Sequence, residues 1–202
     1  MTKIKLCGLT RREDILAANS LSPDYIGFVF AKNSRRFVSP EKAAKLKELL
    51  NPGIAAVGVF VDEAPETVAA LLNAGIIDLA QLHGNESEED IRLLKTMTNK
   101  PLIRAFRVRT PEDLRTAAAS RADHILLDSG AGTGTVFDWS LLRDFDRPYF
   151  LAGGLHPGNA AEAVTLLRPY ALDVSSGIET DGRKDPRKMK DFVTAVRHAD
   201  QL

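Results

Sequence analysis

The sequence has 202 residues, with 27 Lys or Arg against 27 Asp or Glu, so its formal net charge is zero. Hydrophobic residues make up 44% of the chain and charged residues 27%, a balance that excludes an intrinsically disordered protein. The lack of a basic surplus also argues against a nucleic-acid-binding protein, because such proteins neutralise phosphates with Lys and Arg.

The chain contains one cysteine, Cys7, which cannot form an internal disulfide and so favours a reducing compartment. The N-terminal residues lack the apolar stretch of a signal peptide, and no apolar run reaches the ~18 residues of a transmembrane helix. We therefore expect a cytoplasmic protein with neither a membrane nor a nucleic-acid partner.

Eight short apolar runs, several of them rich in β-branched residues, follow one another along the chain. Each is bounded by Gly, Asp, Ser or Pro, which is typical of buried parallel strands. The predicted strands are residues 3–7, 25–30, 55–61, 77–82, 102–106, 124–128, 149–152 and 172–175.

Segments with apolar residues at the helical period lie between these runs. One begins at Ser39-Pro40, where Ser39 is a favourable N-cap and Pro40 fits the first helical position. Thr110-Pro111 and Asp185-Pro186 repeat this pattern. The other predicted helical segments are residues 62–73, 86–96, 110–119, 157–167 and 185–198.

Eight strands, each expected to be followed by a helix, predict parallel strands joined by crossover helices. An open doubly wound sheet and a closed barrel both satisfy this alternation. The pattern shows no extra hairpin or second domain, and a barrel leaves no exposed edge strand. We therefore predict an α/β protein with one catalytic domain, residues 1–202, folded as a (β/α)8 TIM barrel with short loops.

Active sites of such barrels lie at the C-terminal ends of the strands. Cys7 and Asp128 end the first and sixth predicted strands, and Gly153-Gly154 and Ser176-Gly177 follow the seventh and eighth. Loops at these last two positions commonly bind phosphate, because glycines let an anion approach backbone N–H groups. Read alone, each pair could equally be plain turn residues.

The other candidates also have structural readings. Cys7 could be a small buried hydrophobe, and Asp128 could cap the glycine-rich loop that follows it. Arg35 and Arg36 could be an exposed pair, or one of them could hold a carboxylate through two hydrogen bonds. His83 and His156 are more often structural than catalytic. No metal-ligand spacing, dinucleotide fingerprint or Walker loop is present, so neither a metal nor an organic cofactor is expected.

Taken together, these segments resemble the phosphoribosylanthranilate isomerase family. The match is collinear and includes every predicted strand end except the fifth. Three positions depart from the family's usual pattern: Arg35, Ala131 and Gly158. The matching segments are residues 5–10, 27–30, 34–39, 57–61, 81–84, 127–129, 132–134, 137–139, 151–155 and 173–179.

The resemblance implies an Amadori rearrangement of N-(5-phosphoribosyl)anthranilate, with Cys7 as general base and Asp128 as general acid. It also implies that Arg36 binds the anthranilate carboxylate. The phosphate would be held by the loops after the seventh and eighth strands, and we expect a monomer rather than a homodimer. The phosphate-binding residues would be Gly153, Gly154, Ser176 and Gly177, with Lys5, His83 and Asp173 in supporting positions.

Two alternatives remain. Another sugar-phosphate barrel enzyme should have catalytic lysines, metal-binding His and Asp at its strand ends, or paired aspartates in place of Cys7, and none is evident. A regulatory barrel that binds a phosphorylated ligand would need Cys7 and Asp128 only for stability.

Strand alternation places Lys5 on the same face as Cys7. If Cys7 faces the site, Lys5 lies one layer deeper in the barrel and needs a carboxylate partner. Its charge would favour the Cys7 thiolate. Because the reference pKa of cysteine is about 8.5, only a modest lowering would be needed for Cys7 to act as a thiolate.

Overall fold

The structure is a computed structural model that describes residues 1–128, 139–142 and 145–201. The glycine-rich segment expected after the sixth strand, residues 129–134, lies outside the described residues.

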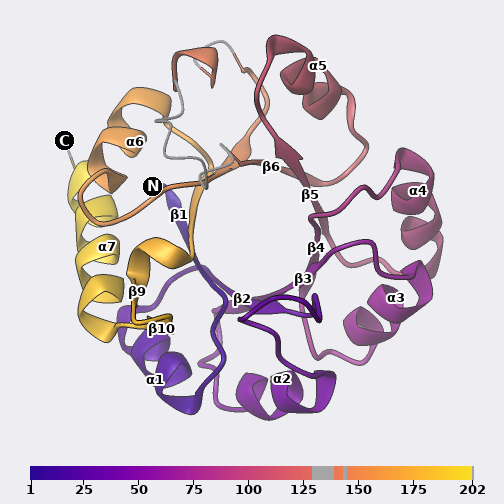
Figure 1. Ribbon diagram of the computed structural model, residues 1–202, viewed down its shortest axis with the longest axis horizontal. Coiled ribbons are helices and arrows are strands. Elements are labelled where there is room, and N and C mark those ends of the chain that lie inside the picture. The colour runs from indigo at the N-terminus through magenta and orange to yellow at the C-terminus, as the bar shows by residue number, and fades with distance from the viewer. Residues whose placement is uncertain (129–138, 143–144, 202) are drawn as a thin grey trace.

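Eight parallel strands close into a barrel in the order of the sequence, as predicted (Figure 1). The seam between the first and last strands pairs Lys5 with Asp173, and the first two strands pair Cys7 with Gly27. The strands are β1 (Lys3–Cys7), β2 (Tyr25–Val29), β3 (Ala55–Phe60), β4 (Leu79–Leu82), β5 (Leu102–Arg107), β6 (His124–Asp128), β7 (Tyr149–Ala152) and β8 (Ala171–Val174).

The helices form a ring around this barrel (Figure 1). Proline occupies the first turn of four of them, including the two predicted from Thr110-Pro111 and Asp185-Pro186. They are α1 (Arg12–Leu21), α2 (Pro40–Lys47), α3 (Pro65–Asn73), α4 (Glu88–Met97), α5 (Pro111–Ala119), α6 (Ala160–Leu167) and α7 (Pro186–Ala199). None of the described helices is long and apolar enough to cross a membrane.

The expectation of eight regular units is wrong in two places. Among the described residues between β6 and β7, the helical segment is a short 3₁₀ helix, η1 (Trp139–Leu142), instead of an α-helix. After β8 the chain forms a second 3₁₀ helix, η2 (Ser176–Ile178), and an antiparallel hairpin of β9 (Glu179–Thr180) and β10 (Arg183–Lys184) before α7 begins.

Two helices begin three residues later than the sequence pattern predicts, because side chains fix the preceding turns. Asp62 adopts a left-handed conformation with φ 51° and accepts a hydrogen bond from the Asn85 backbone, so α3 starts at Pro65. Asn159 accepts a hydrogen bond from the His156 backbone, and α6 starts only after this turn.

The interior of the barrel is separate from the layer between strands and helices, and its lower part is aromatic. Phe150 is fully buried, with its ring centroid 5.4 Å from Tyr25, 5.4 Å from Tyr170 and 5.8 Å from His124. The Tyr25 and Tyr170 hydroxyls lie 2.9 Å apart and share a hydrogen bond. These rings fill the N-terminal half of the barrel, so only its C-terminal half is left for polar groups.

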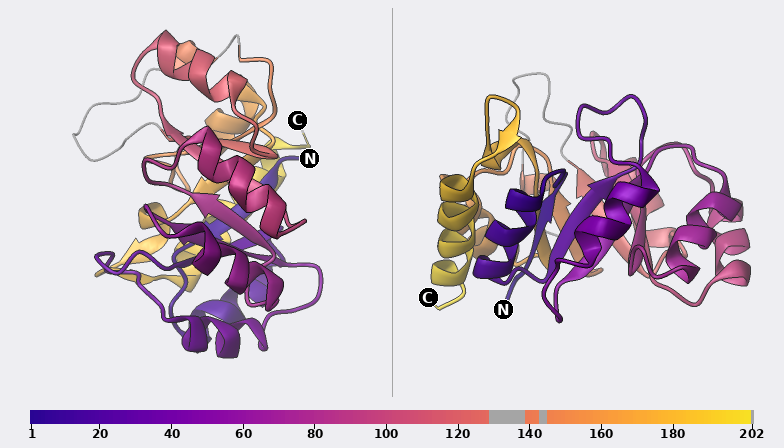
Figure 2. Two further views of the ribbon diagram at one scale, coloured as in Figure 1. Left: turned by 90° about the vertical axis from the view of Figure 1, so that its right-hand side faces the viewer. Right: turned by 90° about the horizontal axis from the view of Figure 1, so that it is seen from below.

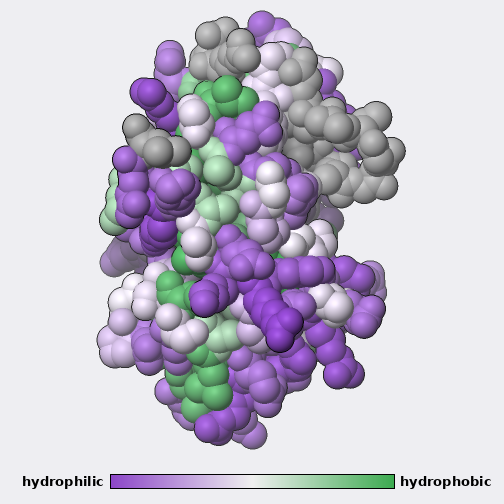
Figure 3. Space-filling view, turned by 90° about the vertical axis from the view of Figure 1, so that its left-hand side faces the viewer, coloured by the Kyte–Doolittle hydropathy of each residue, from purple (hydrophilic) through white to green (hydrophobic). Residues whose placement is uncertain are grey.

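The two ends of the barrel differ in shape. The β9–β10 hairpin and the segment after β2 project from one end, and both chain termini lie at the other (Figure 2). The outer face that carries α6 and α7 is mostly hydrophilic, with a narrow apolar band (Figure 3). The projecting loops therefore distinguish the C-terminal end of the strands, where the candidate residues are concentrated.

Removing the central ring should destabilise the fold strongly. We expect Phe150→Ala to lower the free energy of unfolding by about 3–5 kcal/mol, because it leaves a cavity among three aromatic neighbours. Urea unfolding measures this change, and Phe37→Ala, which removes a ring that is 38% exposed, is the control. Equal effects of the two substitutions would contradict a packed barrel interior.

Candidate active site

The candidate site is a cavity of about 250 Å³ at the C-terminal end of the barrel. It brings together most of the residues that the sequence singled out, although they come from distant parts of the chain. Gly177, which was expected in the phosphate site, is not among the lining residues. Those residues are Cys7, Arg36, Val59, Gln81, His83, Asp128, Ala152, Gly153, Gly154, Leu155, Asp173, Ser175 and Ser176.

A buried ion pair lies at the seam of the barrel, below the Cys7 layer. Lys5 is fully buried, as strand alternation predicts, and its Nζ lies 2.8 Å from Asp173 Oδ2. Burial alone would lower the pKa of Lys5, but the charges of Asp173 and Cys7 outweigh it and raise that pKa. Lys5 is therefore a permanent cation beside the thiol.

Cys7 is 8% exposed and occupies space that a side chain on the neighbouring strand would take. A Cβ on Gly27 would lie 2.6 Å from the Cys7 Sγ, so only glycine leaves room for the thiol. Burial raises the pKa of Cys7 above its ordinary value, and the nearby charges of Lys5 and Lys184 only partly oppose this. The thiolate-favouring effect of Lys5 is thus present, but without substrate it does not prevail.

Asp128 is joined to a short chain of polar side chains across β4 and β6. His83 Nε2 lies 3.3 Å from Asp128 Oδ2, and His83 Nδ1 lies 2.8 Å from Gln81 Nε2. Gln81 is 1% exposed, and its Oε1 has no hydrogen-bond partner among the described residues. His83 therefore positions Asp128 from one side, and Gln81 places an unused acceptor at the cavity.

Arg36 reaches the cavity from the segment after β2 and is held by a carboxylate. Its Nε donates to Glu179 Oε1 at 2.6 Å and its Nη2 to Glu179 Oε2 at 3.0 Å. The Arg35 side chain is 60% exposed and also contacts Glu179, from outside the cavity. Of the two arginines, Arg36 is thus the one that can meet a ligand in the cavity.

The loops after β7 and β8 present backbone N–H groups. Gly153 and Gly154 have φ values of 91° and 65°, in the left-handed region that favours glycine. Among the described residues, no hydrogen bond is donated by the backbone N–H of Gly153, Gly154, Ser176 or Gly177. Consecutive free N–H groups of this kind form a concave anion-binding site.

Gly177 also has a packing role. A Cβ at Gly177 would lie only 1.9 Å from the Leu155 carbonyl oxygen, so the loops after β7 and β8 pack directly against each other at this glycine. Gly177 therefore brings the two loops together, while Gly154 and Ser176 line the cavity.

No role was expected for Gln81, Glu179 or Lys184. Strand alternation could have placed Gln81, which lies two residues before His83 on the same face. Glu179 and Lys184 lie in two-residue strands, too short for any periodic signal. Within the described part of the chain, no group of three or more His, Cys, Asp or Glu residues is placed to hold a metal ion.

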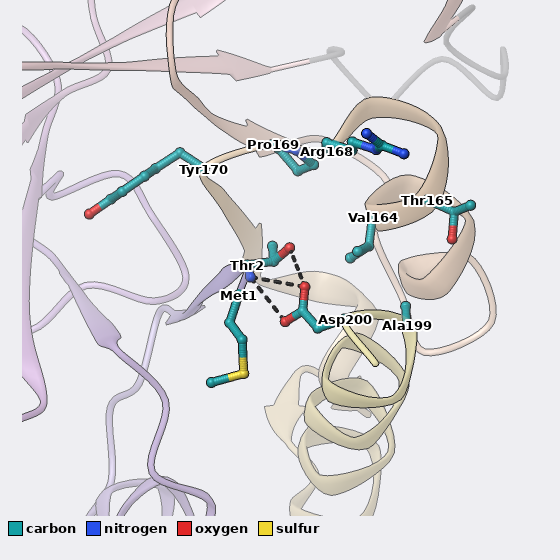
Figure 4. Close-up of a pocket in the computed structure, with 9 residues that line it drawn as sticks. All are labelled: Met1, Thr2, Val164, Thr165, Arg168, Pro169, Tyr170, Ala199 and Asp200. Carbon is teal, nitrogen blue, oxygen red and sulfur yellow. Dashed lines mark hydrogen bonds between the residues drawn. The ribbon is translucent and has the colours of Figure 1, made fainter. Parts of the chain in front are cut away.

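A larger hollow, about 540 Å³, lies at the opposite end of the barrel (Figure 4). There the backbone N–H and the hydroxyl of Thr2 donate to the Asp200 carboxylate, with Val164 drawn on one side of this contact and Tyr170 on the other (Figure 4). This hollow contains neither Cys7 nor Asp128 and lies away from the loops after β7 and β8. Size alone therefore does not identify the functional site.

Comparison with known proteins identifies relatives over almost the whole chain. Residues 4–195 match the family model described as N-(5'-phosphoribosyl)anthranilate (PRA) isomerase. The protein named N-(5'-phosphoribosyl)anthranilate isomerase from Endomicrobium trichonymphae is 44% identical over 202 residues, which cover 98% of this chain and 99% of the relative.

Solved structures of the same name have the same fold. The phosphoribosyl anthranilate isomerase from Thermotoga maritima is 37% identical, covers 98% of this chain and 100% of its own, and superposes with a TM-score of 0.90. A phosphoribosyl anthranilate isomerase solved in complex with reduced 1-(o-carboxyphenylamino)-1-deoxyribulose 5-phosphate has a TM-score of 0.88, 37% identity and the same coverage.

Lys5 and Asp173, the charged residues beside Cys7, should shift the pKa of its thiol in opposite directions. Lys5→Met should raise the pKa of Cys7, because it removes a cation, and Asp173→Asn should lower it, because it removes an anion. The ultraviolet absorbance of the thiolate, followed against pH, measures both changes without interference from another cysteine. Shifts of the same sign in the two variants would contradict this electrostatic account.

Proposed function

The chain belongs to the N-(5'-phosphoribosyl)anthranilate isomerase family, and on that premise we propose how its residues perform the family's reaction. The reaction is the Amadori rearrangement of N-(5-phosphoribosyl)anthranilate to 1-(2-carboxyphenylamino)-1-deoxyribulose 5-phosphate, a step of tryptophan biosynthesis. The observation that carries the assignment of roles is that Cys7 and Asp128 line one cavity together with Arg36 and the loops after β7 and β8.

Asp128 is the general acid of the first step. Its proton goes to the ribose ring oxygen as the C1–O bond breaks, and the nitrogen lone pair forms an iminium ion at C1. Asp128 leaves this step as a carboxylate, which the neighbouring His83 can stabilise by donating from Nε2. A carboxylic acid must hold its proton at neutral pH for this role, which requires a raised pKa in the substrate complex.

Cys7 is the general base of the second step. Its thiolate removes the proton from C2, and the C2–H electron pair forms a C1–C2 double bond while the iminium nitrogen becomes neutral. The resulting enolamine then tautomerises to the ketone. Burial raises the pKa of Cys7 in the free protein, so the thiol must first release its proton to solvent; the positive charge of the iminium then favours the thiolate form that acts as the base.

The two ends of the substrate are both anionic, and the cavity has a group for each. Arg36 binds the anthranilate carboxylate, and the N–H groups of Gly153, Gly154, Ser176 and Gly177 bind the phosphate. The family member crystallised with reduced 1-(o-carboxyphenylamino)-1-deoxyribulose 5-phosphate supports this arrangement, since that compound has a carboxylate at one end and a phosphate at the other.

All the proposed residues come from one chain, so we propose that the protein works as a monomer, with no metal or organic cofactor. A dimeric phosphoribosylanthranilate isomerase exists in Thermotoga maritima. A cytoplasmic location is proposed as well, on the basis of the single unpaired cysteine.

Removing either proton-transfer group should abolish most of the activity. We expect Cys7→Ala and Asp128→Asn each to lower kcat by at least about 10²-fold and to leave KM nearly unchanged, because each removes a proton donor or acceptor and no binding contact. Steady-state kinetics measure both constants. If Asp128→Asn keeps wild-type turnover, the acid lies elsewhere, with Asp173 the next candidate; if Cys7→Ala keeps it, Cys7 is not the base.

A pair of glycine variants can distinguish phosphate binding by Gly154 from the backbone strain that any side chain at a positive φ would cause. Gly154→Ala should raise KM by about tenfold or more, because a side chain at the anion site weakens hydrogen bonds to a charged group. Gly75→Ala is the matched control, since Gly75 has a similar φ of 72° in a turn remote from the cavity. Both variants should lose similar stability, and a KM effect of Gly75→Ala equal to that of Gly154→Ala would exclude a specific phosphate site.

A further inference from the structure

We propose that Glu179 is a positioning residue for substrate binding: it fixes one edge of the Arg36 guanidinium, so that the opposite edge is presented to the substrate carboxylate. The inference rests on the role proposed for Arg36 above and extends it to the β9–β10 hairpin, which lies outside the barrel. It assigns substrate affinity, and no proton transfer, to Glu179.

The Glu179 carboxylate is saturated with donors. Its side chain is 5% exposed, and Oε1 accepts from Arg36 Nε at 2.6 Å and from Lys184 Nζ at 2.7 Å. Oε2 accepts from Arg36 Nη2 at 3.0 Å and from Arg35 Nη2 at 2.8 Å. A buried carboxylate with two bonds to one guanidinium fixes the plane of that group as well as its position.

This arrangement leaves part of Arg36 unused. A guanidinium has five N–H groups, and Glu179 takes one from Nε and one from Nη2. Arg36 Nη1 makes no hydrogen bond with another described residue, and the Arg36 side chain, 21% exposed, lines the cavity. The Nη1–Nη2 edge can therefore donate two hydrogen bonds to a second carboxylate.

Lys184 anchors Glu179 in turn. Lys184 is paired directly with Glu179 across the hairpin, and its side chain is 2% exposed. Its Nζ donates to the Ser175 carbonyl at 2.8 Å, and the Ser175 hydroxyl donates to the Cys7 carbonyl at 3.1 Å. The hairpin is thereby tied to the ends of β8 and β1, so Glu179 has a defined position relative to the cavity.

The backbone beside Arg36 also leaves room for its side chain in this position. Gly8 has a φ of 81°, and a Cβ there would lie 2.4 Å from Arg36 Cδ, so the arginine passes directly over the bare backbone after β1. Gly8 thus leaves space for the side chain that Glu179 holds from its far end.

The charges of the cluster favour an incoming anion. Burial would raise the pKa of Glu179, but hydrogen bonds from Arg36 and Lys184 outweigh it and lower that pKa, so the carboxylate stays ionised. Three cations, Arg35, Arg36 and Lys184, share this one carboxylate. The cluster therefore keeps a net positive charge after Glu179 is counted. Glu179 can orient Arg36 without cancelling the attraction of the cluster for the substrate carboxylate.

The test uses the full-length protein and the variants Glu179→Gln, Arg36→Met and the double variant. We expect Glu179→Gln to raise KM by about tenfold with kcat within about twofold of wild type, since Arg36 is present but no longer oriented. The dissociation constant of anthranilate, measured by fluorescence titration, should rise in parallel. In the double variant KM should equal that of Arg36→Met alone, because Glu179 acts through Arg36.

Asp24→Asn is the matched control. Asp24 accepts hydrogen bonds from Lys3 Nζ at 2.7 Å and from Arg197 Nη2 at 3.2 Å, and none of these three residues lines the cavity. Its variant should lose stability in urea unfolding while KM stays unchanged. If Glu179→Gln does not fold, Glu179→Asp keeps the negative charge in the cluster and shortens the side chain that holds Arg36, and KM should again rise.

The outcomes separate this inference from the proposed function. An unchanged KM in Arg36→Met would refute the role of Arg36 itself. A raised KM in Arg36→Met with a wild-type KM in Glu179→Gln or Glu179→Asp would overturn only the positioning role. So would a double variant whose KM increase is the product of the two single increases, because Glu179 would then act independently of Arg36.

Discussion

The ion pair between Lys5 and Asp173 is the interaction on which the rest of the site depends. It joins β1 to β8, the pair of strands that closes the barrel, and it lies where a barrel normally has apolar side chains. Removing one member of a buried pair costs about 3–5 kcal/mol, because the other charge is left without a partner. The two residues are therefore bound to each other, and the thiol of Cys7 has a cation and an anion fixed beside it.

Above this pair, charges become more numerous and more exposed. Cys7 lies above the ion pair, close to Lys5 and Lys184. The cluster around Glu179 lies at the outer edge of the cavity, where Arg36 is one of the lining residues. In the arrangement we propose, a substrate with an anion at each end is held from the rim and from the loops after β7 and β8. The middle of the cavity is then left to Cys7 and Asp128 for proton transfer. Binding and proton transfer would thus use different residues at different depths.

Sequence patterns predicted the parts of this molecule that repeat. Short apolar runs and Pro at the helix starts specified the barrel, and the order of strand ends placed Cys7, Asp128, Gly153 and Gly154 on one side of it. The β9–β10 hairpin escaped prediction because its strands have two residues each, and with it the partners of Arg36 were missed. The pKa of Cys7 could not be predicted either, since it depends on burial and on a balance of opposing charges that only the packed structure defines. Strand alternation did predict the buried position of Lys5, because a period of two needs no knowledge of the loops.

The aromatic packing around Phe150 has a consequence for how such a protein changes over generations. Tyr25, His124, Phe150 and Tyr170 fill the N-terminal half of the barrel and contribute nothing to the cavity at the other end. These four packing residues are thus separate from the residues that line the cavity. Side chains at the strand ends can therefore be exchanged one at a time during evolution, and the substrate can change while the aromatic packing of the N-terminal half stays the same.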